Sequence, residues 1–249
     1  MTQPQIILFG DSHAYAIQRA IERRIFKRRE LPLQAYRLLK EKNGKTVGDT
    51  SFETFKELAG RLGAEDVVLS AIGGNQHAVF STIQHPVPFD FIDPARPADL
   101  NPEARLIPYR MIEEVFLNGI RNGDGRAIES LRKSTAARVV HIIPPPPKGD
   151  NDFIDRYHET VFAQEGITTL GVSPAVLRLK FWHLQTRILE RLCAELQVDV
   201  MMPPAAALDE AGFLHPDYYA EDATHANPSY GERVLEEVER RFIPRAVEA

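Results

Sequence analysis

A serine near one end of the chain and an aspartate–histidine pair near the other have the types needed for nucleophilic acyl transfer. Ser12 follows an apolar run of strand type, residues 5–9, while Asp222 and His225 stand three positions apart near the C-terminus. A histidine can take the proton of a serine hydroxyl, and a carboxylate can hold the imidazole in the required tautomer. These residues therefore predict Ser12 as a nucleophile, His225 as its base and Asp222 as the group that orients the base.

Further residues have the chemistry to stabilise the oxyanion that such a reaction forms. Gly48 has no side chain, so its backbone amide can approach a developing negative charge closely. The side-chain amide of Asn75 can donate to the same oxygen. Ser12, at the start of a helix, adds its own amide and a favourable field. The predicted oxyanion hole is thus Ser12, Gly48 and Asn75. The structural alternatives are a helix cap for Ser12, a loop cap for Asp222 and a surface histidine for His225.

The elements that must position these residues alternate between strand and helix. Apolar, β-branched runs predict strands at residues 5–9, 33–39, 66–72, 138–143 and 198–202. Apolar residues at helical spacing predict helices from residue 14 onward, around 52–62, and at 109–122, 127–133, 173–197 and 228–242. This alternation favours an α/β fold with a parallel, doubly wound sheet.

The order of the chain brings the candidate residues to one edge of that sheet. Ligands of an open parallel sheet bind outside the carboxyl ends of the strands. Ser12, Gly48 and Asn75 follow the first three predicted strands. Asp222 and His225 lie between the last strand and the last helix. We therefore expect four separate loops to converge on one site.

A proline-rich segment, residues 76–108, interrupts the alternation. Its six prolines suppress long helices and central strands, and its aromatic residues favour a packed lid or a pocket wall. The phenylalanines suit an acyl chain, an aromatic ester or the apolar face of a sugar, and they can equally belong to the core. For the histidines, a structural role is the more common one. The candidate substrate-pocket residues are His13, which follows Ser12, and, within the segment, His77, Phe80, His85, Phe89 and Phe91.

Composition and charge argue against several other classes of function. The 249 residues include 30 basic and 35 acidic side chains, and the resulting net charge of −5 argues against a general nucleic-acid partner. The single cysteine, Cys193, excludes an intrachain disulfide. The histidines have no compact spacing with acids or cysteines, so we expect no metal. No dinucleotide-binding glycine pattern occurs, and we expect no cofactor.

The same sequence predicts one domain over residues 1–249, with residues 76–108 as an inserted loop. No repeat, low-complexity tract or linker divides the chain. No apolar stretch approaches the roughly 18 to 20 residues of a membrane span. No leader-like segment precedes the first strand, and we therefore expect a cytoplasmic protein.

Four short blocks, in chain order, make the sequence resemble the SGNH/GDSL hydrolase superfamily. They are Gly10-Asp11-Ser12, Val47-Gly48-Asp49-Thr50, Gly73-Gly74-Asn75-Gln76 and Asp222-Ala223-Thr224-His225. The resemblance implies a flavodoxin-like three-layer α/β/α sandwich with a central, mostly parallel sheet of about five strands. It also implies the catalytic and oxyanion roles given above. The chain departs from the family's blocks at His13, where the family has leucine, and at Gln76, where it usually has aspartate.

The function predicted from these residues is that of a serine esterase, which cleaves a carboxylic ester through an acyl-enzyme. The expected partner is a small-molecule ester, either an acyl ester or an acylated carbohydrate. One alternative is an O-acyltransferase to a sugar or another hydroxyl acceptor, because the family includes acyltransferases. Another is a non-catalytic binding domain of the same fold. The natural substrate, its acyl length and the oligomeric state do not follow from the sequence.

Overall fold

The computed structural model describes residues 4–29, 31–42 and 44–243, and its centre is a parallel sheet of five strands. The strands are β1 (Ile6–Gly10), β2 (Leu33–Arg37), β5 (Val67–Ala71), β8 (Arg138–Ile142) and β9 (Asp199–Met201). They lie in the order β2-β1-β5-β8-β9. The chain leaves β1 in one direction to reach β2 and then continues on the other side of β1. The switch point of this flavodoxin-like order therefore lies at β1, the strand that leads to Ser12.

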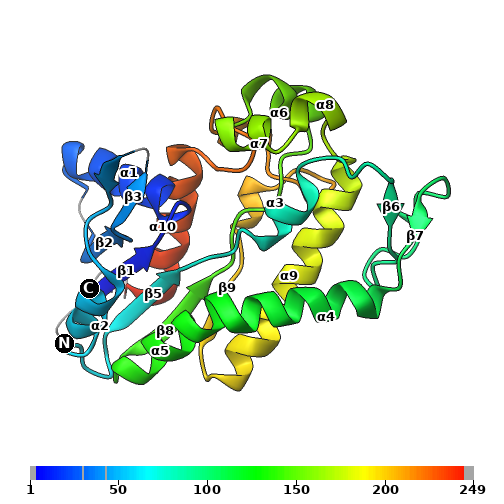
Figure 1. Cartoon of the computed structure of the whole chain (residues 1–249). Helices are drawn as coiled ribbons and strands as arrows, with labels where there is room; N and C mark the ends of the chain where they lie inside the picture. The colour runs from blue at the N-terminus through cyan, green and yellow to red at the C-terminus, as the bar shows by residue number, and fades with distance from the viewer. Residues whose placement is uncertain (1–3, 30, 43, 244–249) are drawn as a thin grey trace.

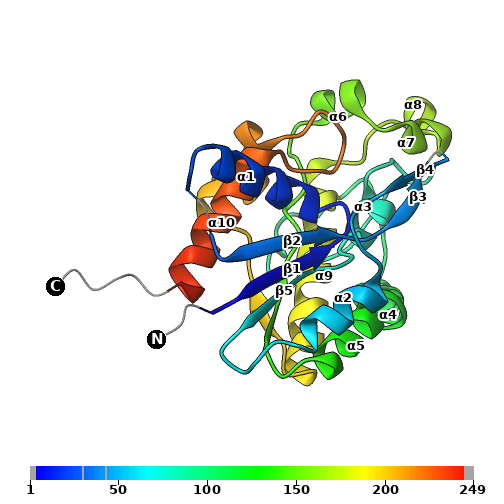
Figure 2. The ribbon, with the colours of Figure 1, turned by 90° about the vertical axis from the view of Figure 1, so that its left-hand side faces the viewer.

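Helices cover both faces of the sheet (Figures 1 and 2). One face carries α1 (Ala14–Phe26) and α10 (Pro228–Phe242), which pack against each other. The other face carries α2 (Phe52–Ala59), α4 (Tyr109–Ile120), α5 (Arg126–Ser134) and α9 (Ala175–Glu195). This arrangement is the three-layer α/β/α sandwich predicted from the sequence.

The side chains of β1 pack alternately against the helices on the two faces of the sheet. Ile6 and Leu8 belong to the core under α1 and α10, whereas Ile7 and Phe9 belong to the core under the opposite helices. All four are almost fully buried. Successive residues of a strand point to opposite faces, so a central strand with apolar residues throughout has a partner for each side chain.

Residues 40–50, where the sequence predicts neither a strand nor a helix, contain a hairpin. In it, β3 (Lys40–Lys42) pairs antiparallel with β4 (Lys45–Val47). Gly48 follows with a φ of +103°, and a Cβ atom there would lie 2.2 Å from the carbonyl oxygen of Leu38. Both the backbone conformation and the space therefore require glycine at this position.

The proline-rich segment contains short elements, as the prolines predicted. They are α3 (Gln76–Ser81), β6 (Phe89–Asp90) and β7 (Arg105–Leu106), and the two strands form a small separate sheet. The two helices predicted after the segment form one helical run, because a wider turn at Arg121–Gly125 connects α4 to α5.

Three short helices between β8 and α9 were not predicted. They are α6 (Asn151–Tyr157), α7 (Thr160–Gln164) and α8 (Ile167–Leu170), grouped above α3 in Figure 1. Single 3₁₀ turns lie at Ala205–Ala207 and Pro216–Tyr218. None of the helices in the described part of the chain has the length and apolar character that crossing a membrane requires.

Candidate active site

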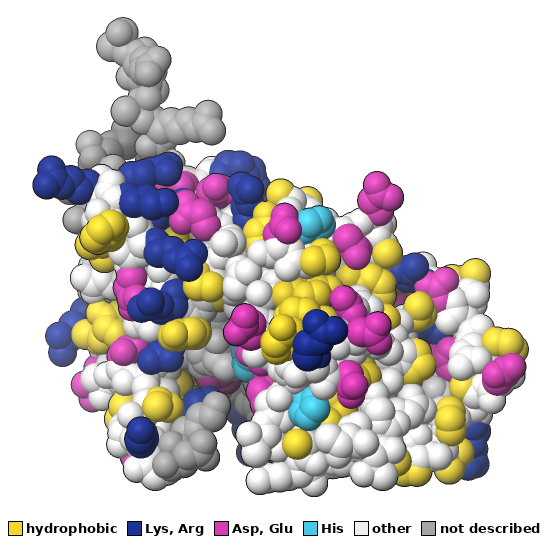
Figure 3. Space-filling view, turned by 90° about the horizontal axis from the view of Figure 1, so that it is seen from above, with side chains coloured by type: hydrophobic (Ala, Val, Ile, Leu, Met, Phe, Trp, Pro, Cys, Tyr) yellow, Lys and Arg dark blue, Asp and Glu magenta, His cyan; other side chains and the backbone are white. Residues whose placement is uncertain are grey.

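Two neighbouring cavities share Ser12 and His225 as lining residues. The first, of about 340 Å³, is also lined by Gly48 and Asp222. The second, of about 810 Å³, is also lined by Asn75. The structure thus gathers all five residues that the sequence assigned to the triad and the oxyanion hole. We call the two cavities together the Ser12 cleft; it is visible at the lower edge of Figure 3 as a gap beside the hairpin.

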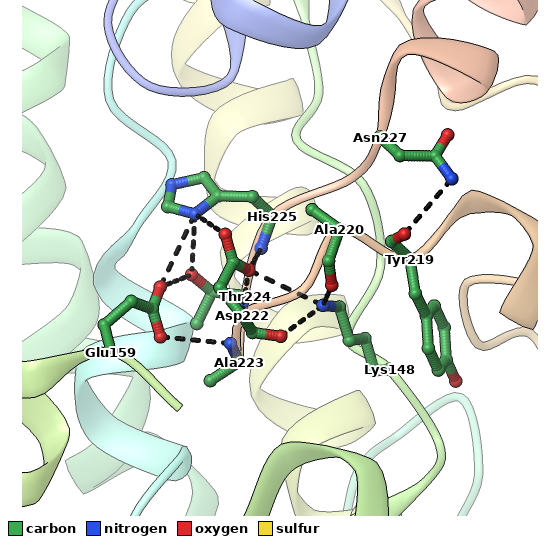
Figure 4. Close-up of polar contacts among 9 residues, drawn as sticks. All are labelled: Lys148, Glu159, Tyr219, Ala220, Asp222, Ala223, Thr224, His225 and Asn227. Carbon is green, nitrogen blue, oxygen red and sulfur yellow. Dashed lines mark hydrogen bonds and ion pairs between the residues drawn. The ribbon is translucent and has the colours of Figure 1, made fainter. Parts of the chain in front are cut away.

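Asp222 holds the histidine through both of its carboxylate oxygens (Figure 4). Oδ1 accepts hydrogen bonds from the backbone amides of Thr224, at 3.0 Å, and His225, at 2.7 Å. Oδ2 lies 2.9 Å from Nδ1 of His225. Because a carboxylate accepts, Nδ1 carries the proton and the neutral ring has Nε2 free to act as a base. Figure 4 shows that second nitrogen turned away from the carboxylates.

A second carboxylate, that of Glu159, lies on the same histidine. Its Oε2 accepts from the backbone amide of Ala223 at 3.0 Å. Its Oε1 accepts from the hydroxyl of Thr224 at 3.2 Å and lies 3.5 Å from Nδ1 of His225. Glu159 precedes α7, one of the helices that were not predicted, and no motif in the sequence singles it out.

A buried lysine, Lys148, binds the loop that carries Asp222 and His225. The side chain of Lys148 is fully buried, and its ammonium donates to the backbone carbonyls of Ala220, at 2.6 Å, and Asp222. The same ammonium lies 3.5 Å from Oδ1 of Asp222. Lys148 follows the four prolines after β8. The sequence does not single it out, because one lysine in a loop carries no signal of burial.

These contacts set the charges of the site. Burial by itself would lower the pKa of His225, but hydrogen bonds and attraction from Asp222 and Glu159 raise it to about 9. Burial opposes the ionisation of Asp222, yet His225 and Lys148 hold the pKa of that carboxyl well below its usual range. Burial lowers the pKa of Lys148 to about 8, against the attraction of Asp222. At neutral pH the imidazole is therefore mostly protonated between two carboxylates.

His13, the first departure from the family's blocks, contacts Asn75. Its Nε2 lies 2.8 Å from Oδ1 of Asn75, and its ring centroid lies 5.8 Å from that of His225. Burial and the neighbouring His225 lower the pKa of His13 to about 4, so the ring is neutral. A carboxamide oxygen only accepts, so His13 donates from Nε2 and leaves the NH₂ group of Asn75 free to donate. Gln76, the second departure, instead reaches the carbonyl of Phe116 at 3.4 Å.

His77 does not line the Ser12 cleft, in contrast to the sequence-based suggestion. It is buried, and its Nδ1 lies 3.0 Å from the carbonyl oxygen of Gly74. Gln185 of α9 donates to the same carbonyl at 2.8 Å and accepts from the backbone amide of His77. Asp124 accepts from the amide of Gly74 at 2.9 Å. His77 thus belongs to the hydrogen bonds that fix the turn before Asn75.

The candidate pocket residues of the proline-rich segment separate into two groups. Phe80, His85 and Phe89 line a third cavity, of about 390 Å³, which shares no lining residue with the Ser12 cleft. Phe91 is fully buried, and its ring packs against that of Phe181 with the centroids 5.1 Å apart. Of the two roles left open for Phe91, the structure therefore selects the core.

Glu159, Asp222 and His225 also place ligand atoms within 4.8 Å of one another, close enough to hold a metal ion. The spacing of residues along the chain predicted no metal, because Glu159 lies more than 60 residues before Asp222 and His225 in the sequence. Each carboxylate oxygen already accepts a hydrogen bond, and the ammonium of Lys148 lies beside Asp222. The contacts therefore fit a hydrogen-bonded histidine, and the positive charge of Lys148 opposes a second cation.

Comparison with known proteins bears on the fold. No protein-family model matches the chain, and no curated protein does. Among solved structures, the periplasmic domain of a lipopolysaccharide acetyltransferase from Salmonella ser. Paratyphi A matches with a TM-score of 0.50 at 12% identity, covering 97% of this chain and 84% of that one. A carbohydrate acetylesterase from Sinorhizobium meliloti matches with a TM-score of 0.46 at 11% identity, over 96% and 100% of the two chains.

A third solved structure is described as a GDSL-like lipase, from Bacteroides thetaiotaomicron. It matches with a TM-score of 0.44 at 15% identity, covering 97% of this chain and 90% of that one. Structural matches at identities this low indicate a shared fold and do not show which reaction the protein catalyses. The match with a TM-score of 0.50 shows that the chain shares its fold with the acetyltransferase domain.

Proposed function

We propose that the protein is a serine esterase that cleaves a carboxylic ester through an acyl-enzyme. The observation that carries the proposal is that Ser12 and His225 line the same cleft, with the imidazole oriented by Asp222. A nucleophile, an oriented base and a nearby amide donor, here Asn75, are the groups that acyl transfer needs. The fold and the order of the four sequence blocks support the same conclusion.

The proposed reaction has two steps. The hydroxyl of Ser12 attacks the ester carbonyl while Nε2 of His225 takes its proton. The oxyanion accepts hydrogen bonds from the backbone amides of Ser12 and Gly48 and from the side-chain NH₂ of Asn75. His225 then gives its proton to the leaving alcohol. In the second step a water molecule, activated by the same histidine, attacks the acyl-enzyme and releases the acid.

Glu159 and Lys148 act on this reaction through the histidine and its loop. The carboxylates of Asp222 and Glu159 both stabilise the imidazolium that forms in each step. They also raise the pKa of His225 to about 9, so only a small part of the free protein holds a neutral base at pH 7. Esterase activity should therefore rise as the pH increases toward 9.

A fluorophosphonate probe tests the proposal directly, because it labels an activated serine. The wild type and Ser12→Ala are treated with the probe, and both are assayed with p-nitrophenyl acetate. We expect labelling and turnover in the wild type and neither in the variant. A folded wild type that takes no label and cleaves no ester would contradict the proposal and favour a binding domain.

Acyl transfer to a hydroxyl acceptor is the second candidate function. It is favoured by one finding, namely that the neighbour with a TM-score of 0.50 is described as an acetyltransferase domain. A hydrolase and a transferase differ in what attacks the acyl-enzyme. The two are therefore distinguished by measuring how the acyl group divides between water and an added acceptor. If sugars and simple alcohols never divert the acyl group from water, the transferase is excluded for those acceptors.

A further inference from the structure

The cavity that shares no lining residue with the Ser12 cleft is almost wholly apolar. It lies between α3, α4 and the proline-rich segment, and its lining includes Phe80, Phe89, Met111, Val115 and Phe181. Arg105 and His85 supply its polar groups, and every other lining residue is apolar. Its volume of about 390 Å³ falls in the range of small-molecule sites. We call it the apolar cavity.

Large side chains of this cavity remain in contact with water. Met111 and Val115 on α4 are 61% and 52% exposed, and Phe80 on α3 is 45% exposed. Apolar surface in water is unfavourable in proportion to its area, and neighbouring apolar side chains left open in this way often mark a binding surface. A hydrophobic group in the cavity would remove these side chains from water.

The wall formed by the proline-rich segment is anchored to α9 at Asp90, next to Phe89. Asp90 and its partner Lys180 are both buried, and each carboxylate oxygen lies 2.8 Å from the ammonium. Asp90 also accepts from the backbone amide of Asn101 at 2.8 Å, which connects two stretches of the proline-rich segment. A buried charge pair with this many partners holds its neighbours in one arrangement.

A second buried carboxylate, Asp93, fastens the same segment. Its oxygens lie 3.0 Å from Nδ1 of His183 and 2.9 Å from a guanidinium nitrogen of Arg187, both on α9. Of the two roles expected for the segment, a lid or a pocket wall, these contacts favour the wall. A wall that is already in place costs little conformational entropy when a ligand binds.

Helix α3 connects this cavity to the Ser12 cleft. Asn75 stands at its N-terminus, Ala78 and Val79 line the cleft, and Phe80 lines the apolar cavity. A helix rises about 1.5 Å per residue, so Phe80 lies only about 8 Å further along the axis than Asn75. The exposed side chain of Val79, which is apolar, lies between the two.

We propose that the apolar cavity binds the acyl chain of the substrate, so that the protein prefers esters of medium-chain acids to acetyl esters. The chain would cross Val79 from the carbonyl carbon at Ser12 and end among the phenylalanine rings. This inference rests on the proposed esterase function and names its substrate class.

A matched pair of variants tests the proposal. Val115 on α4 lines the cavity and is 52% exposed, whereas Leu106 on β7 is 53% exposed and does not line it. Because both side chains are half exposed, a charge at either position should leave the fold intact. kcat/KM is measured for p-nitrophenyl acetate and octanoate on the wild type, Val115→Glu and Leu106→Glu.

We expect the wild type to prefer octanoate by about tenfold or more, since each methylene that the cavity removes from water strengthens the binding of the acyl chain. Val115→Glu should remove most of that preference and leave acetate within about twofold, because a carboxylate in the cavity disfavours an alkyl chain. Leu106→Glu should change neither ester. An unchanged octanoate-to-acetate ratio in Val115→Glu, or an equal loss in Leu106→Glu, would overturn the proposal.

Binding without turnover separates this proposal from the esterase proposal. A fluorescent fatty-acid analogue, 11-(dansylamino)undecanoic acid, is titrated into Ser12→Ala alone and combined with each of the two substitutions. Binding that is weakened by Val115→Glu and not by Leu106→Glu supports the cavity as an acyl site even if no ester is cleaved. Binding that is insensitive to Val115→Glu rejects it, whatever the esterase assay shows.

Discussion

The Ser12 cleft and the apolar cavity are built from the chain in different ways. The candidate reacting residues of the cleft are polar and come from separate segments of the sequence, from Ser12 to His225, and a hydrogen bond from Asp222 holds His225 in place. Those of the cavity are apolar, come mainly from residues 80–116, and are fastened to α9 by buried carboxylates. The cleft lies where the sheet topology directs any ligand, whereas the cavity forms between the proline-rich segment, α4 and α9. Under the two proposals above, the reaction depends on the fold, and the choice of substrate depends on residues 80–116.

The largest effect should come from the nucleophile, and it should not distinguish short from long esters. Ser12→Ala is expected to lower kcat by about 10⁴-fold or more on p-nitrophenyl acetate and octanoate alike, because the acyl-enzyme cannot form. Circular dichroism should show an unchanged fold. A variant that kept its activity on either ester would remove Ser12 from the mechanism.

The next effect concerns the oxyanion hole. Asn75→Ala should lower kcat by about 10²–10³-fold on both esters, since it removes one donor to the oxyanion. His13→Leu should lower kcat less, because Asn75 remains and only loses the hydrogen bond that orients it. If His13→Leu were as slow as Asn75→Ala, His13 would itself have to contact the substrate.

Replacing Asp90, which holds the cavity wall on α9, should lower the stability of the protein and its activity on long esters, but not its activity on acetate. Asp90→Asn removes the charge that balances the buried ammonium of Lys180, and unfolding in urea should show a loss of about 3–5 kcal/mol. Activity on octanoate should fall while activity on acetate is kept, because the cleft does not depend on this wall. Equal losses on both esters would mean that the two regions are not independent.

The smallest effect is a shift in the pH at which kcat/KM rises, and it involves only residues of the Ser12 cleft. Only neutral His225 can act as a base, so kcat/KM on acetate should rise through its pKa of about 9. Glu159 raises that pKa, and Glu159→Gln should therefore move the midpoint to lower pH and also reduce the plateau.

Glu165→Gln provides the control for that measurement. Glu165 is exposed and follows the C-terminal end of α7, so its substitution changes the net charge equally without touching His225. It should leave the midpoint in place. A midpoint that stayed near 9 in Glu159→Gln would show that Asp222 alone sets the pKa.

Much of the fold was predictable because its elements have regular periodicity. Each of the five strands is present within two residues of its predicted bounds, and α10 begins and ends as predicted. Helices α6, α7 and α8 were missed because they are too short to show a periodic pattern. The hairpin of β3 and β4 was missed because its strands are polar and are paired mainly with each other.

The candidate site was predictable where a residue has a chemical reason to follow a strand. Ser12, Gly48 and Asn75 could be chosen by type and position, and they line the cleft. Phe91 and His77 could not be separated from the pocket residues, because an aromatic ring in a proline-rich segment has the same local pattern in a core as in a cavity. Only their burial distinguishes them.

The sequence by itself determined the types of the reacting groups, their order along the chain and the alternation of strands and helices that brings them to one edge. Only the tertiary structure decided that His13 orients Asn75, 62 residues away, and that Glu159 and Lys148 hold the loop of Asp222. The physical reason is that strands and helices arise from local periodicity, which a sequence displays. A hydrogen bond between distant segments depends on where the whole sheet places them.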